Sequence, residues 1–273
     1  MNETFKYIGI SILFIISLIY TNHISNVVKS RDPIMIKINE VSNNIKVDSV
    51  NAVLNDDEII PGKSGCDIDI NKSYENMKKV NEYTEKMLKY KDLIPEITIT
   101  NIYNKYISSG NRFNRNVSIV VYIKDDIEKL NKIDDIKLNV FLDGNMFNNG
   151  KIDISNNKKI YNGGIDGDYD DTTIEWVNDV ISDYNNPVYC LNIDKNDNNL
   201  LICARNRMHT ISPKIMGNNI LKLKSNIDNG SIIYFDENNI GKINIVSDYI
   251  LKKGYNIVYL DELLNENICN KLM

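Results

Sequence analysis

One long apolar run stands near the N-terminus of the chain. Residues 7–20, with the sequence YIGISILFIISLIY, are almost entirely apolar, and no Lys, Arg, Asp or Glu occurs between Lys6 and Lys29. About 18 such residues are enough for a helix to cross the hydrocarbon core of a bilayer. A cleaved signal peptide would need a small-x-small site after the run, and none follows. We therefore expect a short tail over residues 1–6 and a transmembrane anchor over residues 7–24. Basic residues flank the anchor on both sides, so the positive-inside rule leaves its orientation open.

The next segment, residues 25–111, predicts a small membrane-proximal α+β module. Residues 33–54 alternate apolar and polar positions on both sides of a Ser-Asn-Asn turn, which is typical of a β-hairpin. Residues 56–69 contain Pro-Gly and Ser-Gly and are expected to form a loop. Residues 73–91 have helical periodicity. The apolar face of that helix is formed by Tyr74, Met77, Val80, Met87 and Leu88.

From residue 112 onward, buried strands alternate with short helices. Strands are expected at 116–124, 136–144, 187–193, 209–213 and 230–236. Helices are expected at 125–133, 172–184, 197–208 and 241–255. The helix at 172–184 is predicted to begin at a Thr172-x-x-Glu175 capping box. Repeated βα units of this kind predict a parallel sheet or a barrel over residues 112–273.

Composition and charge narrow the class of protein. The hydrophobic share of 42% and the charged share of 25% are those of a globular protein, and the net charge of −5 argues against nucleic acid as a partner. The four cysteines show no CxxC and no zinc-site spacing. Cys190 and Cys203, on a strand and the following helix, are either a disulfide of an oxidising compartment or two buried thiols. The single tryptophan, Trp176, lies on a predicted helix, where a core position is favoured over stacking on a sugar.

An aspartate-rich turn, IYNGGIDGDYDD, occupies residues 160–171. Asp166, Asp168 and Asp170 have the alternate spacing of calcium-loop carboxylates, but the turn lacks the sixth-position glycine and the twelfth-position glutamate of an EF-hand. The alternative is a solvated turn in which Asp170 or Asp171 favours the N-terminus of the next helix. Both interpretations stay open on the sequence alone.

Three segments of the C-terminal part resemble the polysaccharide deacetylases, the NodB-like family also called carbohydrate esterase family 4. They are NVFLDGNMF (139–147), GSIIYFD (230–236) and LKKGYNIVYLDELL (251–264). Residues 55–78 also resemble the membrane-proximal part of some membrane-anchored members from low-GC Gram-positive bacteria. The resemblance implies a distorted (β/α) barrel with fewer than eight repeats, placed outside the cytoplasmic membrane.

The resemblance also implies that the catalytic groups of active members are missing. Those members use one Asp as base, and a second Asp with two His to hold a divalent metal that activates water. Tyr122 and Ile123 stand at the positions of the two aspartates, and Phe235 at that of the histidine thought to act as acid. Gly163 and Gly167 replace the two metal-binding histidines.

Histidine is also too scarce for that site. The chain has two, of which His23 borders the anchor, so only His209 belongs to the barrel, where it is expected to be structural. A site with two histidine ligands and a third as acid needs more. No metal or other cofactor is therefore expected.

The leading hypothesis is a single-pass membrane protein with its large domain outside the cytoplasm, a pseudoenzyme that acts as a glycan-binding or scaffolding module of the cell envelope. The expected partners are the membrane, through the anchor, and a cell-wall or surface glycan. A first alternative is a divergent carbohydrate deacetylase or hydrolase that uses Asp166, Asp168 and Asp236. A second is a structural subunit of a membrane protein. If Tyr122, Ile123 and Phe235 fill the cleft at the strand ends, a glycan has no room there.

Overall fold

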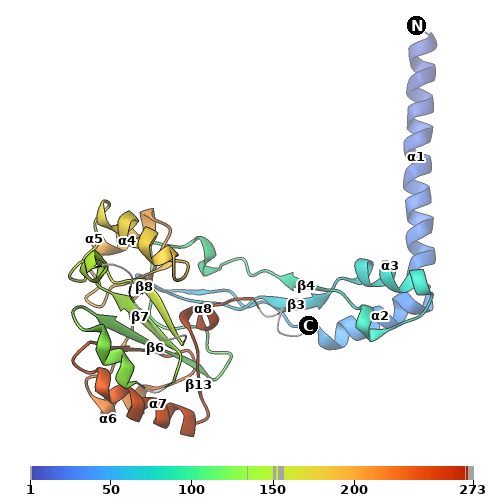
Figure 1. The fold of residues 1–273 in the computed structure, drawn as a ribbon. Helices are drawn as coiled ribbons and strands as arrows, with labels where there is room; N and C mark the ends of the chain where they lie inside the picture. Colours follow the sequence, from blue (N-terminus) through green and yellow to red (C-terminus); the bar gives the residue numbers. More distant parts are fainter. Residues whose placement is uncertain (1, 134, 150–151, 153–156, 268, 270–273) are drawn as a thin grey trace. The chain divides into compact units, whose positions relative to one another are not determined.

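The computed structural model describes residues 2–133, 135–149, 152, 157–267 and 269 (Figure 1). The chain divides into two compact units. The first comprises Met1–Ser49, Ser64–Ile94 and Ile268–Met273, and the second comprises Val50–Lys63 and Pro95–Asn267. Residue 1 of the predicted tail and residues 270–273 of the predicted barrel domain lie outside the described residues.

The first unit begins with a long apolar helix, α1 (Asn2–Ser30). Within it, the 20 residues Ser11–Ser30 have a mean hydropathy of 1.5, and none of them is buried. Such a helix is long and apolar enough to cross a membrane. The helix α1 contains the whole predicted anchor, residues 7–24, and continues six residues beyond its predicted end.

The predicted hairpin at 33–54 is wrong, because its first half is the helix α2 (Pro33–Ile45). Asp32 caps the helix, since its carboxylate accepts a hydrogen bond from the Ile34 amide at 2.9 Å, and Pro33 fills the first helical position. The buried residues of α2 have helical spacing rather than the alternation of a strand. They are Ile34, Met35, Ile38 and Ser42.

The rest of the first unit packs on α2. The helix predicted over 73–91 is α3 (Ile70–Val80), which ends at Asn81 because that residue has a left-handed backbone, with φ at 53°. A short 3-10 helix (Glu85–Met87) follows. Strands β3 (Gly65–Ile68) and β4 (Tyr90–Leu93) pair antiparallel. The small core consists of Ile34, Ile38, Ile68, Met77 and Leu88. A disulfide joins Cys66 of β3 to Cys269.

The second unit is built on one eleven-stranded sheet in the order β1-β2-β5-β10-β9-β8-β7-β6-β12-β11, with β13 paired to β6 off this path. All its strand pairs are parallel except β1–β2. The predicted distorted barrel is confirmed. The strands are β1 (Val53–Leu54), β2 (Glu58–Ile60), β5 (Tyr106–Ile107), β6 (Asn116–Ile123), β7 (Leu138–Leu142), β8 (Lys158–Asn162), β9 (Tyr189–Leu191), β10 (His209–Ile211), β11 (Ile215–Met216), β12 (Ile232–Phe235) and β13 (Asn256–Ile257).

Three of these strands, β1, β2 and β5, come from the segment predicted to be membrane-proximal. Strand β2 pairs with β5, and β5 pairs with β10 of the barrel. The predicted boundary at residue 112 therefore falls within the second unit.

Helices connect the strands; all but the last cover one face of the sheet, and the last packs on the core inside the barrel (Figure 1). They are α4 (Thr173–Ser182), α5 (Asp197–Arg205), α6 (Ile220–Asn226), α7 (Ile243–Lys252) and α8 (Leu260–Leu263). Four 3-10 helices complete the unit: Ile99–Asn101, Ile127–Lys132, Gly144–Asn149 and Ile240–Lys242. The predicted capping box is wrong: Thr172 makes no capping bond, and Asp170 instead accepts hydrogen bonds from the Thr172 and Thr173 amides.

The sheet buries apolar side chains on both faces, as parallel strands between two layers do. Along β6, Val117, Ile119, Val121 and Ile123 pack in the core beneath the helices. Val120 of the same strand packs in a second core inside the barrel, together with Phe141, Tyr161 and Tyr189 of β7, β8 and β9. Successive residues of a strand thus face alternately the helices and the barrel interior.

Candidate functional site

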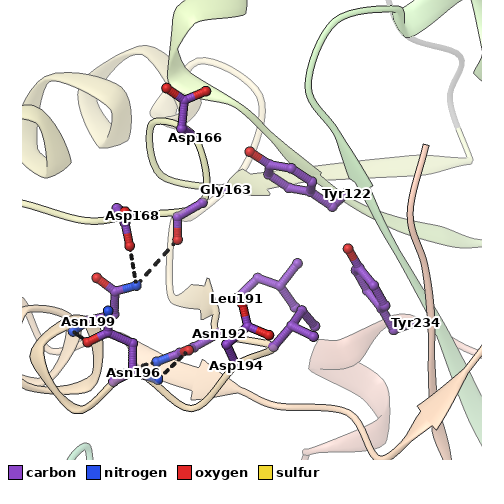
Figure 2. A pocket seen from close by; sticks show the side chains of 12 residues that line it. Tyr122, Gly163, Asp166, Asp168, Leu191, Asn192, Asp194, Asn196, Asn199 and Tyr234 are labelled. Carbon is purple, nitrogen blue, oxygen red and sulfur yellow. Dashed lines mark hydrogen bonds between the residues drawn. The ribbon is translucent and has the colours of Figure 1, made fainter. Parts of the chain in front are cut away.

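A cleft of about 440 Å³ opens where several parallel strands of the barrel end. Parallel strands present their carboxyl ends at one edge of the sheet, which is where α/β folds bind ligands. Figure 2 shows the two tyrosines of the cleft on one side, and Asp168 with Asn199 across from them. The lining residues are Tyr122, Gly163, Asp166, Gly167, Asp168, Leu191, Asn192, Ile193, Asp194, Asn196, Asn199 and Tyr234.

On β6, the alternation of the strand separates the two residues predicted to replace aspartates. Tyr122 faces the barrel interior and lines the cleft. Ile123 faces the helix layer and is fully buried there. Of this pair, only the tyrosine can contact a ligand.

On β12, the same alternation points Tyr234, and not Phe235, into the cleft. Phe235, predicted at the position of the catalytic histidine, is fully buried beneath the helices. A β-carbon at Gly217 would lie only 2.1 Å from the Phe235 ring, so the ring packs directly on that glycine. Tyr234 faces the cleft instead. The cleft is therefore not filled by Ile123 and Phe235, and Tyr122 forms part of its wall.

At the end of β8, Gly163, which is predicted at the position of the first family histidine, has no space for a side chain. A β-carbon on Gly163 would lie 2.6 Å from the carbonyl oxygen of Leu142 and 2.9 Å from the ring of Tyr122. Real β-carbon contacts do not reach such short distances. In this backbone conformation, a side chain at position 163 would collide with the Leu142 backbone of β7 and with the Tyr122 ring.

The aspartate-rich turn is a tight hairpin. Ile165 and Asp168 exchange two backbone hydrogen bonds, of 2.8 and 3.0 Å, around Asp166 and Gly167. Both central residues have positive φ, 55° and 84°, as an Asp-Gly pair does in a type I′ turn. Gly167, which is predicted at the position of the second family histidine, therefore serves the turn.

A buried carboxylate that the sequence analysis missed fixes this turn to β6 and β7. Asp143, fully buried, follows β7. Its carboxylate accepts hydrogen bonds from the Tyr122 hydroxyl at 2.8 Å, the Asp166 amide at 2.6 Å and the Asn145 amide at 2.9 Å. Asp143 therefore orients Tyr122 and holds the turn in one position.

Helix α5 holds the other end of the turn. Asn199 accepts a hydrogen bond from the Tyr169 amide and donates two, to the Gly167 carbonyl at 3.3 Å and the Asp168 carboxylate at 3.1 Å. A disulfide between Cys190 of β9 and Cys203 joins α5 to the sheet. Helix α5 therefore holds this side of the cleft, where the loop between β9 and α5, residues 192–196, also contributes to the lining.

The three candidate aspartates of the sequence analysis do not gather at one point. Asp166 and Asp168 both line the cleft, and Asp166 pairs with Lys124 at 2.7 Å. Asp236 does not line it, because its carboxylate bonds to the amide and side chain of Asn239. Asp194, which was not predicted, contributes the third carboxylate of the lining.

Both tyrosines of the cleft are neutral phenols. Burial and the hydrogen bond to Asp143 raise the pKa of Tyr122. Burial, with the nearby carboxylates of Asp236 and Asp194, raises the pKa of Tyr234 to about 12. The charge of the lining therefore comes from aspartates alone.

The residues present do not fit the divalent metal of active deacetylases. His209 is the first residue of β10 and stacks on Tyr103 with ring centroids 4.6 Å apart, so it lies at the strand end away from the cleft. Among the described residues, no group of three or more His, Cys, Asp and Glu side chains is arranged to hold a metal ion. Trp176, on α4, is 39% exposed rather than in the core, and it does not line the cleft.

Comparisons with known proteins bear on the fold. No protein-family model and no curated protein matches the sequence. Among solved structures, a pseudoenzyme of carbohydrate esterase family 4 from Bacillus anthracis is similar, with 18% identity and a TM-score of 0.62 over 85% of this chain and 95% of that one. A mutant of that pseudoenzyme with restored enzymatic activity is also similar, with 18% identity and a TM-score of 0.59 over 85% of this chain and 98% of that one. The resemblance to polysaccharide deacetylases is thereby confirmed at the level of the fold.

Proposed function

We propose that the protein is a catalytically inactive, deacetylase-like module, anchored in the membrane with its barrel outside the cytoplasm, and that it binds a glycan of the cell envelope. The observation that carries this proposal is the makeup of the strand ends. A cleft remains there, lined by Tyr122, Gly163 and Tyr234 among others, and its lining contains no histidine that could hold the metal of active members.

The loss of catalysis is supported by packing as well as by residue identity. Gly163 cannot accept a side chain, and Ile123 and Phe235 face away from the cleft. A single substitution at any of these positions would therefore not rebuild a ligand set. Two cleft carboxylates, of Asp166 and Asp168, remain for the alternative of an aspartate-only hydrolase.

Glycan binding is supported by the shape and chemistry of the cleft. Its volume lies within the range of about 300–1,000 Å³ usual for small-ligand sites. Two tyrosine rings offer apolar faces for sugar rings, and carboxylates and side-chain amides offer partners for hydroxyl groups.

The extracytoplasmic location is supported by the cysteines together with α1. All four cysteines form disulfides, Cys66–Cys269 and Cys190–Cys203. Disulfides persist in oxidising compartments and are rare in the cytosol. The helix α1 supplies the means of attachment.

The experiment combines metal analysis, acetate release and glycan binding. The full-length protein, purified in detergent, is incubated with Zn²⁺, Co²⁺ or Ca²⁺, and bound metal is measured beside hydrolysis of N-acetylated chitooligosaccharide. We expect no stoichiometric metal and no acetate, together with measurable binding of amino-sugar oligosaccharides by calorimetry. Stoichiometric metal with acetate release would instead establish the divergent hydrolase.

A further inference from the structure

The lining of the cleft contains three carboxylates and no cationic side chain. Asp166, Asp168 and Asp194 line it, and the lining includes no Lys, Arg or His. Only Asp166 is neutralised, by Lys124. Within the part of the chain that the structure describes, Asp168 and Asp194 form no ion pair.

The lysine that follows Asp194 in the chain is held elsewhere. Lys195 has a left-handed backbone, with φ at 53°, and its ammonium pairs with Asp57 at 2.7 Å and Glu58 at 2.9 Å. Glu58 is itself buried and also bonds to Lys214 and Ser108. This network fixes Lys195 away from the cleft and leaves the charge of Asp194 exposed to a ligand.

The amide donors of the cleft are largely used within the protein. The side-chain amide of Asn199 donates to the Gly167 carbonyl and to the Asp168 carboxylate. The side-chain amide of Asn192 donates to the Asn196 carbonyl at 2.8 Å. The Tyr122 hydroxyl donates to Asp143. Acceptors, in particular the carboxylates of Asp168 and Asp194, therefore outnumber the donors that remain for a ligand.

A surface of this kind discriminates between the two forms of an amino sugar. An N-acetyl group presents a carbonyl oxygen, which needs a donor or a cation opposite it. A free amine is an ammonium with three donors, and its hydrogen bonds to carboxylates are charge-assisted. We infer that the ligand of the cleft is a glycan with free amino groups, a de-N-acetylated amino sugar, recognised by Asp168 and Asp194 beside Tyr122 and Tyr234. This inference rests on the proposed function of glycan binding.

The test compares two tetrasaccharides on the full-length protein in detergent, by calorimetry at mildly acidic pH. One is β-1,4-linked glucosamine, and the other is its fully N-acetylated counterpart. We expect the free-amine form to bind at least about tenfold more tightly, because each charge-assisted bond strengthens only that complex.

Matched variants assign the preference to the cleft. Asp194→Asn is expected to weaken binding of the glucosamine tetrasaccharide about three- to tenfold, and to leave the acetylated form unchanged. Asp248→Asn is the control, because it removes the same charge from an exposed position on α7 outside the cleft. Tetralysine is a second control for attraction by charge alone.

The outcomes separate this inference from the function on which it rests. Equal affinity for the two tetrasaccharides, or tighter binding of the acetylated one, overturns amine recognition and leaves glycan binding intact. Tetralysine binding as tight as glucosamine binding, or equal losses in Asp194→Asn and Asp248→Asn, also overturns it. If neither sugar binds, the proposed function fails as well.

Discussion

At the scale of single residues, the cleft is determined by backbone spacing as much as by side-chain chemistry. Gly163 follows β8, and its amide donates a hydrogen bond of ordinary length, 2.9 Å, to the Leu142 carbonyl of β7. The backbone at Gly163 nevertheless points its missing β-carbon at that carbonyl oxygen, only 2.6 Å away. A histidine at this position would therefore require the local backbone to shift.

Gly163→Ala tests this spacing. We expect the free energy of unfolding to fall by about 1–3 kcal/mol, because a β-carbon forced against a strand backbone must displace it. Denaturant unfolding of both proteins measures the difference. Gly241→Ala is the matched control, since nothing lies within 4 Å of a β-carbon there. An unchanged stability of Gly163→Ala would show that the strands adjust without strain.

Two residues of the site could have been found in the sequence only with the register of the strands. Tyr234 and Phe235 are neighbours in an apolar strand buried on both faces, and such a strand does not reveal which position points inward. Asp143 follows a buried strand, but its bonds to Tyr122 and the Asp166 amide join segments more than twenty residues apart. The missing histidines, by contrast, were evident from the count alone.

At the scale of secondary-structure elements, local signals predicted the βα repeats well and the N-terminal part poorly. Strand β6 and helices α5 and α7 lie where periodicity placed them. The alternation after Pro33 was misleading, because capping by Asp32 and the proline itself favour a helix more strongly. Strand β8 was missed because its five residues precede a glycine pair, which indicated a turn.

Strand β10 carries a histidine whose protonation opposes folding. Burial lowers the pKa of His209 to about 4, against a hydrogen bond to the Ile102 carbonyl that acts in the opposite direction. Its buried Nδ1 has no hydrogen-bond partner. The unfolded chain therefore takes up a proton near pH 6.5, which the folded protein resists until about pH 4.

Lowering the pH from above 6.5 to about 4 should therefore destabilise the protein through this residue, by roughly 2–3 kcal/mol. His209→Phe keeps the aromatic stack but cannot titrate. The difference in unfolding free energy between the two proteins, followed by denaturant unfolding from pH 7 to pH 4, is expected to move in favour of the variant. A difference that stays constant over this range would contradict the assignment.

At the scale of the whole molecule, the two units are interleaved along the chain. Residues 50–63 belong to the barrel unit although they lie between two segments of the first unit. Residues 50–63 belong to the barrel unit because β2 pairs with β5, and β5 pairs with β10. Local sequence patterns carry no information on such long-range pairing. The boundary predicted at residue 112, where the βα repeats begin, therefore lies inside the second unit.

The disulfide between Cys66 and Cys269 joins two residues that are 203 positions apart in the sequence. It closes the chain between them into a covalent ring that contains nearly all of the barrel unit. One proteolytic cut inside that ring cannot shed the barrel from α1, because the two pieces remain bonded. Limited proteolysis should give a nicked species of full mass on a non-reducing gel and two fragments after reduction. Fragments already separate before reduction, from a single cut between residues 66 and 269, would refute the ring. At the proposed location outside the cytoplasm, such a ring would make attachment of the barrel to α1 tolerant of a first cut and sensitive to thiols.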